Sequence, residues 1–466
     1  MFRDRVRTIH FVGIGGIGMS GIAEVLLNLG FAVTGSDLKG GGAAERLRGL
    51  GATVHVGHDA RWVGDADVVV RSSAVGADNP EVAEAVRRGI PVIPRAEMLA
   101  ELMRLRSGIA VAGSHGKTTT TTMVAACLVA AGQDPTIVIG GRVGMLGDTN
   151  ARLGQGDWLV AEADESDGSF LLLTPTMALV TNIDPEHLDH YETFEALEAA
   201  FLQFVNSVPF YGAAVLCLDH PVVQRLIPGV RRRVITYGLA RNADVRATAL
   251  ARDGLHSTFR VVRGDEVLGE IRLAMPGTHN VLNAVGAVAL ALDLGVPFAD
   301  IQRGLDGFGG VQRRFTVRGE EGGVLVVDDY GHHPVEVAAT LRAAAEAFPE
   351  RRIRAVFQPH RYTRLRDCWQ EFTTCFSEAD DVYVVPVYAA GEEPVVGVDH
   401  EAIARAIRDH GHRGVVAVSS LAAVQRELLE RASAGDVVIT LGAGNVNEIC
   451  APLLAELGRR PPEGGA

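Results

Sequence analysis

Lysine is almost missing from this 466-residue chain, because only Lys39 and Lys117 occur among its 44 basic residues. Arginine supplies nearly all the positive charge, so each retained lysine raises the question of what its site requires. Acidic residues outnumber basic ones, and the formal net charge is 44 minus 57, or -13. This balance argues against nucleic acid or an anionic membrane as the main partner. An anionic substrate must then be met by local positive groups.

Cysteine pairs and long apolar runs are also missing. The five cysteines form no CxxC pair and no Cys/His cluster at zinc spacing, which predicts free thiols in a reducing compartment. Apolar runs such as Met123–Gly132 fall well short of the ~20 residues that cross a bilayer. Residues 1–7 lead into no apolar segment with a cleavage site. We expect a cytoplasmic protein without an export signal or a transmembrane segment.

Length and composition predict a multidomain globular protein. Apolar residues make up 47% of the chain and charged residues 22%, which is typical of soluble proteins. At roughly 100 to 200 residues per domain, the length predicts about three domains. We expect boundaries near residues 107 and 312, and therefore domains at 1–107, 108–312 and 313–466.

The pattern along the chain is that of repeated βα units. Short Val/Ile/Leu runs are each followed by a turn and an Ala/Leu-rich segment of helical period, which predicts an α/β fold with parallel sheets throughout. An alanine-rich helix is expected over residues 280–294. The expected strands are Thr8–Val12, Ala32–Gly35, Thr53–Val56, Val68–Arg71, Pro91–Ile93, Gly108–Ala112, Trp158–Val160, Val324–Val327, Arg354–Phe357, Val382–Val385, Val415–Val418 and Val437–Leu441.

The first motif is GIGGIG at residues 13–18, between an expected strand and a helix. Glycines allow the backbone to approach a diphosphate, and the helix N-terminus supplies amide donors. With Asp37 at the end of the next strand, the ordinary interpretation is a dinucleotide site. The same residues are also compatible with a tight turn that binds no ligand, in which case Asp37 is a solvated carboxylate.

The second motif is GSHGKTTT at residues 113–120, again between a strand and a helix. It departs from the strict phosphate-loop pattern, since Val111 stands where the first glycine is expected. The chemistry survives this departure. Backbone amides still cradle phosphates, Lys117 neutralises charge on the β and γ oxygens, and the Thr118 hydroxyl reaches Mg2+.

Acidic side chains follow two further strands, in AEADESD at residues 161–167 and TNIDPEHLDHY at residues 181–191. Strand ends are where open parallel sheets bind ligands, and oxygen ligands suit Mg2+. Generic acidic loops look the same on spacing alone.

Taken together, eight ordered motifs across the whole chain resemble the Mur ligase family. The last two are most similar to the member that adds L-alanine. Besides the four already quoted, the motifs are PGTHNVLN at residues 276–283, RRF at 313–315, DDYGHHP at 328–334 and QPHRYTR at 358–364.

The resemblance implies an N-terminal Rossmann-like UDP-sugar domain, a central ATPase domain of the P-loop type and a C-terminal Rossmann-like amino-acid domain. It also implies that ATP and Mg2+ drive ligation of L-alanine to UDP-N-acetylmuramate through an acyl phosphate. In this interpretation the first glycine loop holds a UDP-sugar diphosphate, which displaces the dinucleotide. The implied UDP-sugar residues are Gly15, Gly16, Gly18, Asp37, Ser72 and Ser73.

The implied ATP residues are Gly113, Ser114, His115, Gly116, Lys117, Thr118, Thr119, His279, Asn280, Asn283 and Arg314. For residues 278–283, the alternative is a polar helix N-terminus in which Thr278 caps the helix and Asn283 satisfies a loop. Thr118, Glu162 and His187 are the implied metal ligands.

Catalysis is assigned to Lys117, His187, His332, Arg361 and Arg364. The resemblance implies that Tyr330 and His332 lie near the incoming amino acid. Arg361 and Arg364 are assigned to the same side of the site, because arginine binds a carboxylate or a transferring phosphate in a bidentate way. His332 fits a hydrogen-bonded loop histidine as well, and we expect His360 to order its loop.

Three alternatives remain. A nicotinamide-dependent dehydrogenase explains residues 13–18 but not GSHGKTTT, and a nucleotide-binding switch uses the phosphate loop without forming a bond. The related ligase that recycles murein tripeptide differs mainly around the amino-acid loop. We expect a monomer or weak homodimer that binds no nucleic acid and no membrane.

One departure from related ligases concerns a carbamylated lysine, which several of them carry some fifteen residues beyond the histidine equivalent to His187. Residues 188–212 contain no lysine, and Phe201 and Leu202 near the corresponding place look like core. We therefore expect a second metal held by His187, ATP phosphate and the substrate carboxylate.

Overall fold

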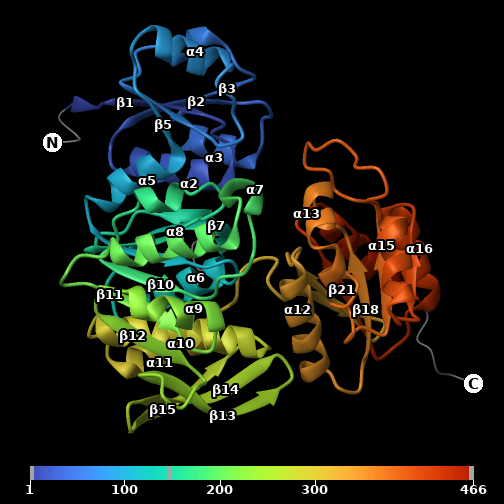
Figure 1. The fold of residues 1–466 in the computed structure, drawn as a ribbon. Helices are drawn as coiled ribbons and strands as arrows, with labels where there is room; N and C mark the ends of the chain where they lie inside the picture. The colour runs from blue at the N-terminus through green and yellow to red at the C-terminus, as the bar shows by residue number, and fades with distance from the viewer. Residues whose placement is uncertain (1–4, 144–148, 461–466) are drawn as a thin grey trace, which may run out of the picture. The chain divides into compact units, whose positions relative to one another are not determined.

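The computed structural model describes residues 5–143 and 149–460. These residues form two compact units. The first comprises the chain up to Ala249 together with Phe259–Arg272 and Leu282–Gly309. The second comprises Leu250–Thr258, Leu273–Val281 and the chain from Gly310 onward. Three sheets organise the fold, and Figure 1 follows them along the chain.

The first sheet has five parallel strands in the order β3-β2-β1-β4-β5. Side chains alternate between its two faces, so Phe11 enters the large core with α2, whereas Val12 enters a smaller one with α4. In Figure 1 the sheet lies between these helices. Its elements are β1 (Thr8–Val12), α2 (Ile17–Asn28), β2 (Ala32–Asp37), α3 (Gly42–Gly49), β3 (Thr53–Val56), η1 (Ala60–Val63), β4 (Val68–Arg71), α4 (Pro80–Arg87), β5 (Val92–Pro94) and α5 (Arg95–Met103).

The second sheet has ten strands in the order β15-β14-β13-β12-β11-β10-β6-β9-β7-β8. One continuous apolar core joins strands β6 to β11 to helices α2 and α5, which cover the first sheet. Its elements are β6 (Ser107–Ala112), α6 (Lys117–Ala130), β7 (Thr136–Val143), β8 (Thr149–Arg152), β9 (Trp158–Glu162), η3 (Ser169–Leu172), β10 (Met177–Val180), α7 (Leu188–Tyr191), α8 (Phe194–Asn206), β11 (Ala213–Cys217), α9 (Pro221–Leu226), η4 (Ile227–Gly229), β12 (Val234–Gly238), β13 (Val245–Asp253), β14 (His256–Arg263), β15 (Glu266–Leu273), α10 (Thr278–Asp293) and α11 (Phe298–Asp306).

The third sheet has six strands in the order β16-β17-β21-β18-β19-β20 and a separate core on each face. Its elements are β16 (Thr316–Glu321), β17 (Val324–Asp329), α12 (Pro334–Ala347), β18 (Arg352–Phe357), α13 (Tyr362–Asp367), α14 (Trp369–Phe372), β19 (Asp381–Val384), α15 (His400–Asp409), β20 (Val415–Ala417), α16 (Leu421–Arg431), β21 (Asp436–Leu441), η5 (Val446–Ile449) and α17 (Cys450–Leu457).

The expectation of parallel strands throughout is wrong at sheet edges. β8 runs antiparallel to β7, and β16 runs antiparallel to β17. The physical reason is the short connection in each case, since parallel neighbours need a crossover of a dozen or more residues. An antiparallel edge strand on a largely parallel sheet is a common arrangement.

The strands expected by name differ only slightly in their bounds, whereas β7, β8 and β10 to β16 were not expected by name. The strand expected at Pro91–Ile93 lies one residue later, at Val92–Pro94. Three strands are longer than expected and end at acidic residues: β2 ends at Asp37, β9 at Glu162 and β17 at Asp329. None of the five cysteines, all of them in the described part of the chain, forms a disulfide. Among the described residues, no helix combines the length and apolar character needed to cross a bilayer.

Candidate active site

The first glycine loop, residues 13–18, is held by the strand beside it. Gly13 adopts a φ of +85°, and the N–H groups of Gly13 and Ile14 donate to the Ser36 carbonyl at 2.8 and 3.0 Å. The Gly15 N–H donates to the Asp37 carboxylate at 2.9 Å. Asp37 therefore holds the loop in this structure. Its carboxylate accepts the hydrogen bond of the Gly15 amide, which could otherwise be donated to a diphosphate.

Ser72 and Ser73 follow β4 and line a cavity of about 240 Å3 with Arg71, Arg95 and Ser169. Ser72 also lies against Gly13, since a Cβ added at that glycine would meet the Ser72 Cβ at 3.0 Å. Arg95 pairs at 3.3 Å with Asp164, in the loop that follows β9 of the second sheet. The serines expected to hold a UDP-sugar are thus beside the glycine loop, in a cavity with two arginines.

The second loop, residues 113–116, connects β6 to α6. β6 lies between β9 and β10 in parallel register, so the loops after these three strands meet at one edge. Gly113 has a φ of +132° and Gly116 a φ of +82°. A Cβ on Gly113 would approach the Asn182 carbonyl to 2.9 Å, and one on Gly116 would approach Asn283 Oδ1 to 2.6 Å. Glycine at both positions therefore allows close packing as well as the turn.

Lys117 begins α6 and folds back over this loop. Its ammonium donates to the carbonyls of Gly113 at 2.6 Å and Ser114 at 3.1 Å, and to Glu165 Oε1 at 2.8 Å. Burial alone would lower the pKa of Lys117, but Glu165 and neighbouring carboxylates outweigh it and the net shift is upward. Lys117 is therefore a fixed cation at the edge of the phosphate loop.

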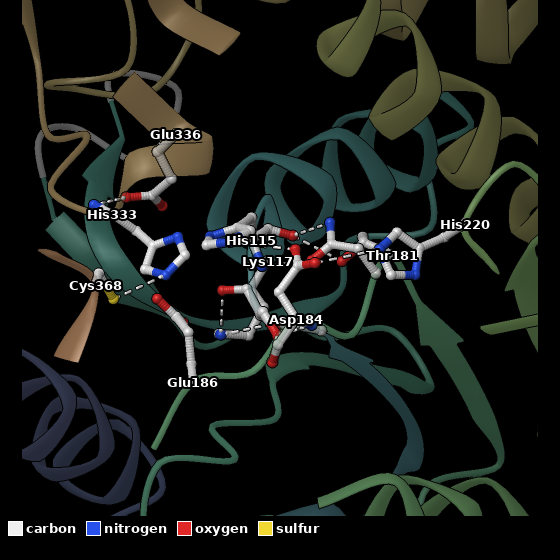
Figure 2. A network of polar contacts seen from close by, with 12 residues as sticks. His115, Lys117, Thr181, Asp184, Glu186, His220, His333, Glu336 and Cys368 are labelled. Atoms are coloured by element: carbon white, nitrogen blue, oxygen red, sulfur yellow. Dashed lines mark hydrogen bonds and ion pairs between the residues drawn. The ribbon is translucent and has the colours of Figure 1, made fainter. Parts of the chain in front are cut away.

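A second set of polar contacts ties the phosphate loop to the segment after β10 (Figure 2). The His115 N–H donates to Asn182 Oδ1 at 2.7 Å, and Thr181 Oγ1 donates to the His115 carbonyl at 2.7 Å. Asp184 lies 3.4 Å from both His115 Nε2 and His220 Nε2. Burial alone would raise the pKa of Asp184, but hydrogen bonds from these histidines hold it well below its usual range.

Glu162 ends β9 beside α6. Its Oε1 accepts the Gly140 N–H at 2.8 Å, and a hydrogen bond from Thr118 reaches its side chain. Burial raises the pKa of this carboxyl. The structure thus brings together Thr118 and Glu162, two of the expected metal ligands.

The third expected ligand, His187, lies in another group. Ligand atoms of Glu165, Glu186 and His187 all fall within 4.8 Å of one another. Glu165 is fully buried, burial raises its pKa, and its Oε2 has no hydrogen-bond partner. An orphaned buried carboxylate oxygen beside a second carboxylate and an imidazole fits a divalent cation. The other carboxylate oxygen of Glu165, Oε1, already accepts a hydrogen bond from Lys117.

α10 carries the residues expected at the adenosine part of ATP. Asn283 lies against Gly116, so it reaches the phosphate loop. Asn280 donates its side-chain amide to the Pro276 carbonyl at 2.8 Å, which supports the alternative of a local role at the helix start. Thr278 is the first residue of the helix, and its hydroxyl accepts from Arg252 at 2.9 Å. Thr119 is buried within α6.

In the second unit, three expected residues gather around Glu336 on α12. Arg314 pairs with Glu336 at 3.5 Å and lies over the Tyr330 ring at 5.2 Å. His332 Nδ1 is 3.4 Å from Glu336 and 3.1 Å from the Tyr330 carbonyl. Burial, with help from Arg314, lowers the pKa of His279 to about 4, so this imidazole is neutral near pH 7.

His360 connects this cluster to the expected arginines. Its ring lies 5.7 Å from that of His332 and stacks on Tyr388, and its Nδ1 is 3.3 Å from Arg364 Nη1. Burial first, and then His332 and Arg364, lower the pKa of His360 to about 3. Arg361 has a φ of +68°, and its N–H donates to the Tyr388 carbonyl at 2.9 Å. A neutral His360 that orders its surroundings agrees with the loop role expected for it.

Sequence reasoning missed several residues of both clusters. Glu165, Glu186 and Asp184 stand inside quoted motifs, yet nothing local marks Glu165 or Asp184 as a partner of Lys117 or His115. Glu336 falls outside every motif. Only Glu186 carried a local signal, because it stands directly before the assigned His187.

Family models match the chain in three consecutive segments, described as the Mur ligase family catalytic domain at residues 8–107, the middle domain at 111–291 and the glutamate ligase domain at 313–444. A UDP-N-acetylmuramate–L-alanine ligase from Anaeromyxobacter sp. (strain Fw109-5) is 58% identical over 98% of this chain and 99% of its own.

Two solved structures share the whole architecture. The UDP-N-acetylmuramate-alanine ligase of Thermotoga maritima is 29% identical, with a TM-score of 0.81 and coverage of 96% of this chain and 98% of its own. A murein peptide ligase from Psychrobacter arcticus is 26% identical, with a TM-score of 0.71 and coverage of 98% and 99%. With three domain models in order and a relative at 58% identity, the chain belongs to the Mur ligase family.

Proposed function

We propose that this chain ligates L-alanine to the lactyl carboxylate of UDP-N-acetylmuramate, with conversion of ATP to ADP and phosphate. The observation that carries the proposal is the Lys117 ammonium fixed on a glycine loop among buried carboxylates, in a chain 58% identical to an L-alanine ligase. The loop suits a polyphosphate and the carboxylates suit its counter-cation.

We assign one substrate to each domain. Residues 1–107 bind the UDP-sugar through the loop at residues 13–18 and the serines after β4. Residues 108–312 bind ATP, and residues 313–466 bind alanine. Support for the first assignment comes from the cavity beside Ser72 and Ser73, and support for the second comes from Lys117 and Asn283 at the phosphate loop.

The chemistry requires an activated carboxylate, because a free carboxylate is a poor electrophile. A carboxylate oxygen attacks the γ-phosphorus of ATP, the bond to the β-phosphate oxygen breaks, and ADP leaves. The alanine amine then attacks the carbonyl carbon, and the tetrahedral intermediate expels phosphate to give the amide. Lys117 stabilises the negative charge on the phosphoryl oxygens during the first transfer.

A bound Mg2+ would supply further charge neutralisation at the transferred phosphoryl group. Thr118 and Glu162 would form one set of protein ligands for it. His187, with Glu165 and Glu186 beside it, would hold a second ion together with the ATP phosphate and the substrate carboxylate. The orphaned Oε2 of Glu165 supports the second set.

On the alanine side, Arg361 and Arg364 bind a carboxylate, and His332 accepts a proton from the incoming ammonium group. Glu336 orients the His332 ring through its Nδ1, which leaves Nε2 for the proton. Tyr330 supports this ring from 5.3 Å.

A coupled phosphate-release assay tests the proposal. The purified chain is given ATP, Mg2+ and UDP-N-acetylmuramate, with L-alanine, glycine, L-serine or murein tripeptide in parallel. Phosphate release that depends on both UDP-N-acetylmuramate and L-alanine is the expected result. Release with tripeptide but not with alanine would assign the recycling reaction, and release with ATP alone would indicate a nucleotide switch.

A further inference from the structure

A buried hydrogen-bond network around a carboxylate lies beneath α4, on the far side of the first sheet from α2. Its centre is Glu81, in the first turn of α4, whose side chain is 0% exposed. His10 of β1 is also fully buried, and His58 follows the end of β3. None of these residues belongs to a motif that the proposed function uses.

The contacts are short and specific. Glu81 Oε2 lies 2.5 Å from His10 Nε2, and Oε1 lies 2.8 Å from His58 Nδ1. The hydroxyl of Ser36 reaches the same His58 nitrogen at 2.9 Å. Burial alone would raise the pKa of Glu81, but hydrogen bonds from His10, Ser36 and His58 outweigh it, so the carboxyl is ionised.

Stability alone does not account for such a network. The surrounding core is apolar, with Val12, Val69 and Val82 among its members. Removing a charge from water is costly, and apolar residues of similar volume often stabilise a fold as well as a buried ion pair does. A buried charge is best attested where it specifies one arrangement of the chain.

Ser36 connects the network to the glycine loop. Its side chain contacts His58, while its carbonyl accepts the N–H groups of Gly13 and Ile14. The next residue, Asp37, accepts the Gly15 N–H through its carboxylate and the Gly57 N–H through its carbonyl. Ser36, whose carbonyl holds the loop, is therefore contacted on its side chain by His58, which in turn pairs with Glu81.

We propose that Glu81 is a positioning residue for the UDP-sugar, acting through His58 and Ser36 on the loop at residues 13–18 without touching the ligand. The inference rests on the proposed role of that loop in binding UDP-N-acetylmuramate. Glu81 determines the affinity for this substrate because loop amides a few tenths of an ångström out of place lose hydrogen bonds to a diphosphate.

The test compares Glu81→Gln with Glu84→Gln in the full chain. Glu84 lies one turn further along α4 and pairs only with Arg87 at the surface among the contacts described, so the control changes the same helix by the same substitution. In Glu81→Gln a neutral amide replaces the carboxylate and its NH2 group replaces one acceptor oxygen, so the hydrogen bond that His10 or His58 donates to that oxygen is lost. We expect the Kd for UDP-N-acetylmuramate, measured by titration calorimetry, to rise about tenfold, equal to about 1.4 kcal/mol.

Kinetics separate positioning from general damage. The KM for UDP-N-acetylmuramate should rise in parallel, whereas kcat and the KM values for ATP and alanine stay within twofold. His58→Asn keeps a donor near the Nδ1 position and should retain most of the affinity, whereas His58→Leu should lose it. Ser36→Ala should weaken binding while leaving the pairs of Glu81 with His10 and His58 intact. This variant provides the test if Glu81→Gln does not fold.

Unchanged affinity in Glu81→Gln and Ser36→Ala would overturn the inference, whatever happens to the melting temperature. An equal loss of affinity for ATP would do the same, because it would show a general structural role. Failure of the wild-type chain to bind UDP-N-acetylmuramate would instead reject the proposed function of the loop.

Discussion

Lys117 gives the most direct test at the scale of single residues. We expect Lys117→Ala to reduce ADP formation at least a thousandfold, on the order of 4 kcal/mol of lost transition-state stabilisation. UDP-N-acetylmuramate binding should stay nearly intact, because that ligand is assigned to another domain. The measurements are ADP release and calorimetric binding. Lys39→Ala, at the only other lysine, is the matched control and should retain its kcat; normal turnover in Lys117→Ala would refute the assignment.

His332 is assigned to the second half reaction only. His332→Ala should slow amide formation by about 10²-fold, the usual scale of general acid–base catalysis. Acyl phosphate, trapped with hydroxylamine, should still form. If no acyl phosphate is trapped in this variant, His332 acts in phosphoryl transfer or in stabilising the fold instead.

Phe201 explains why no carbamylated lysine is expected near the second metal. Its ring is fully buried and packs on Phe170, and Leu202 packs against the same core. Activity in CO2-depleted buffer should therefore equal activity in bicarbonate. Mg2+ affinity, followed by calorimetry, should rise when UDP-N-acetylmuramate joins ATP. Inactivation that bicarbonate reverses would contradict this prediction.

At the scale of elements, the phosphate loop depends on glycine geometry. Gly113→Ala would force a side chain into a left-handed conformation, at a cost of about 1 to 2 kcal/mol, and against the Asn182 carbonyl. We expect at least tenfold weaker ATP binding, with UDP-N-acetylmuramate binding unchanged. Gly41→Ala is the control, because nothing lies near its added Cβ. Normal ATP affinity in Gly113→Ala would show that the loop tolerates the side chain.

Strand–turn–helix units were predictable because their signals are local. The strand β1 and the loop–helix unit at β6 and α6 lie where apolar runs and glycines placed them, and the family resemblance is confirmed. Edge pairings such as β16 with β17 were not predictable, since the alternating apolar pattern of a β-strand is the same whether its neighbour runs parallel or antiparallel. Chain direction relative to a neighbour depends on the connection and on the sheet it joins.

At the scale of the whole molecule, the neutral histidines make stability depend on pH. The folded pKa values of His279, about 4, and His360, about 3, lie below the ordinary value of 6.5. Between pH 6.5 and 4 the unfolded chain binds more protons, so stability present above pH 6.5 is lost as pH falls. The melting temperature should drop by several degrees between pH 7 and 5, and less in His279→Gln. An identical drop in that variant would remove His279 from the explanation.

Two expectations for the whole protein stay predictions, namely a cytoplasmic location and a monomeric or weakly dimeric state. The domain limits at residues 107 and 312 also stay predictions. The first falls at the start of β6, and the second falls between α11 and β16. The described residues up to 309 share one compact unit that contains the first two sheets, apart from short segments at residues 250–258 and 273–281.

The sequence by itself determined the family, the α/β class and the two glycine-containing loops that follow β1 and β6, because each motif is a short run whose backbone geometry is set by neighbours in the chain. Only the tertiary structure decided which charges meet. Lys117 pairs with Glu165, 48 residues away in the sequence, and His10 pairs with Glu81, 71 residues away. Such pairs form where parallel strands and the helices that cover them bring distant segments together, and no local pattern records that register.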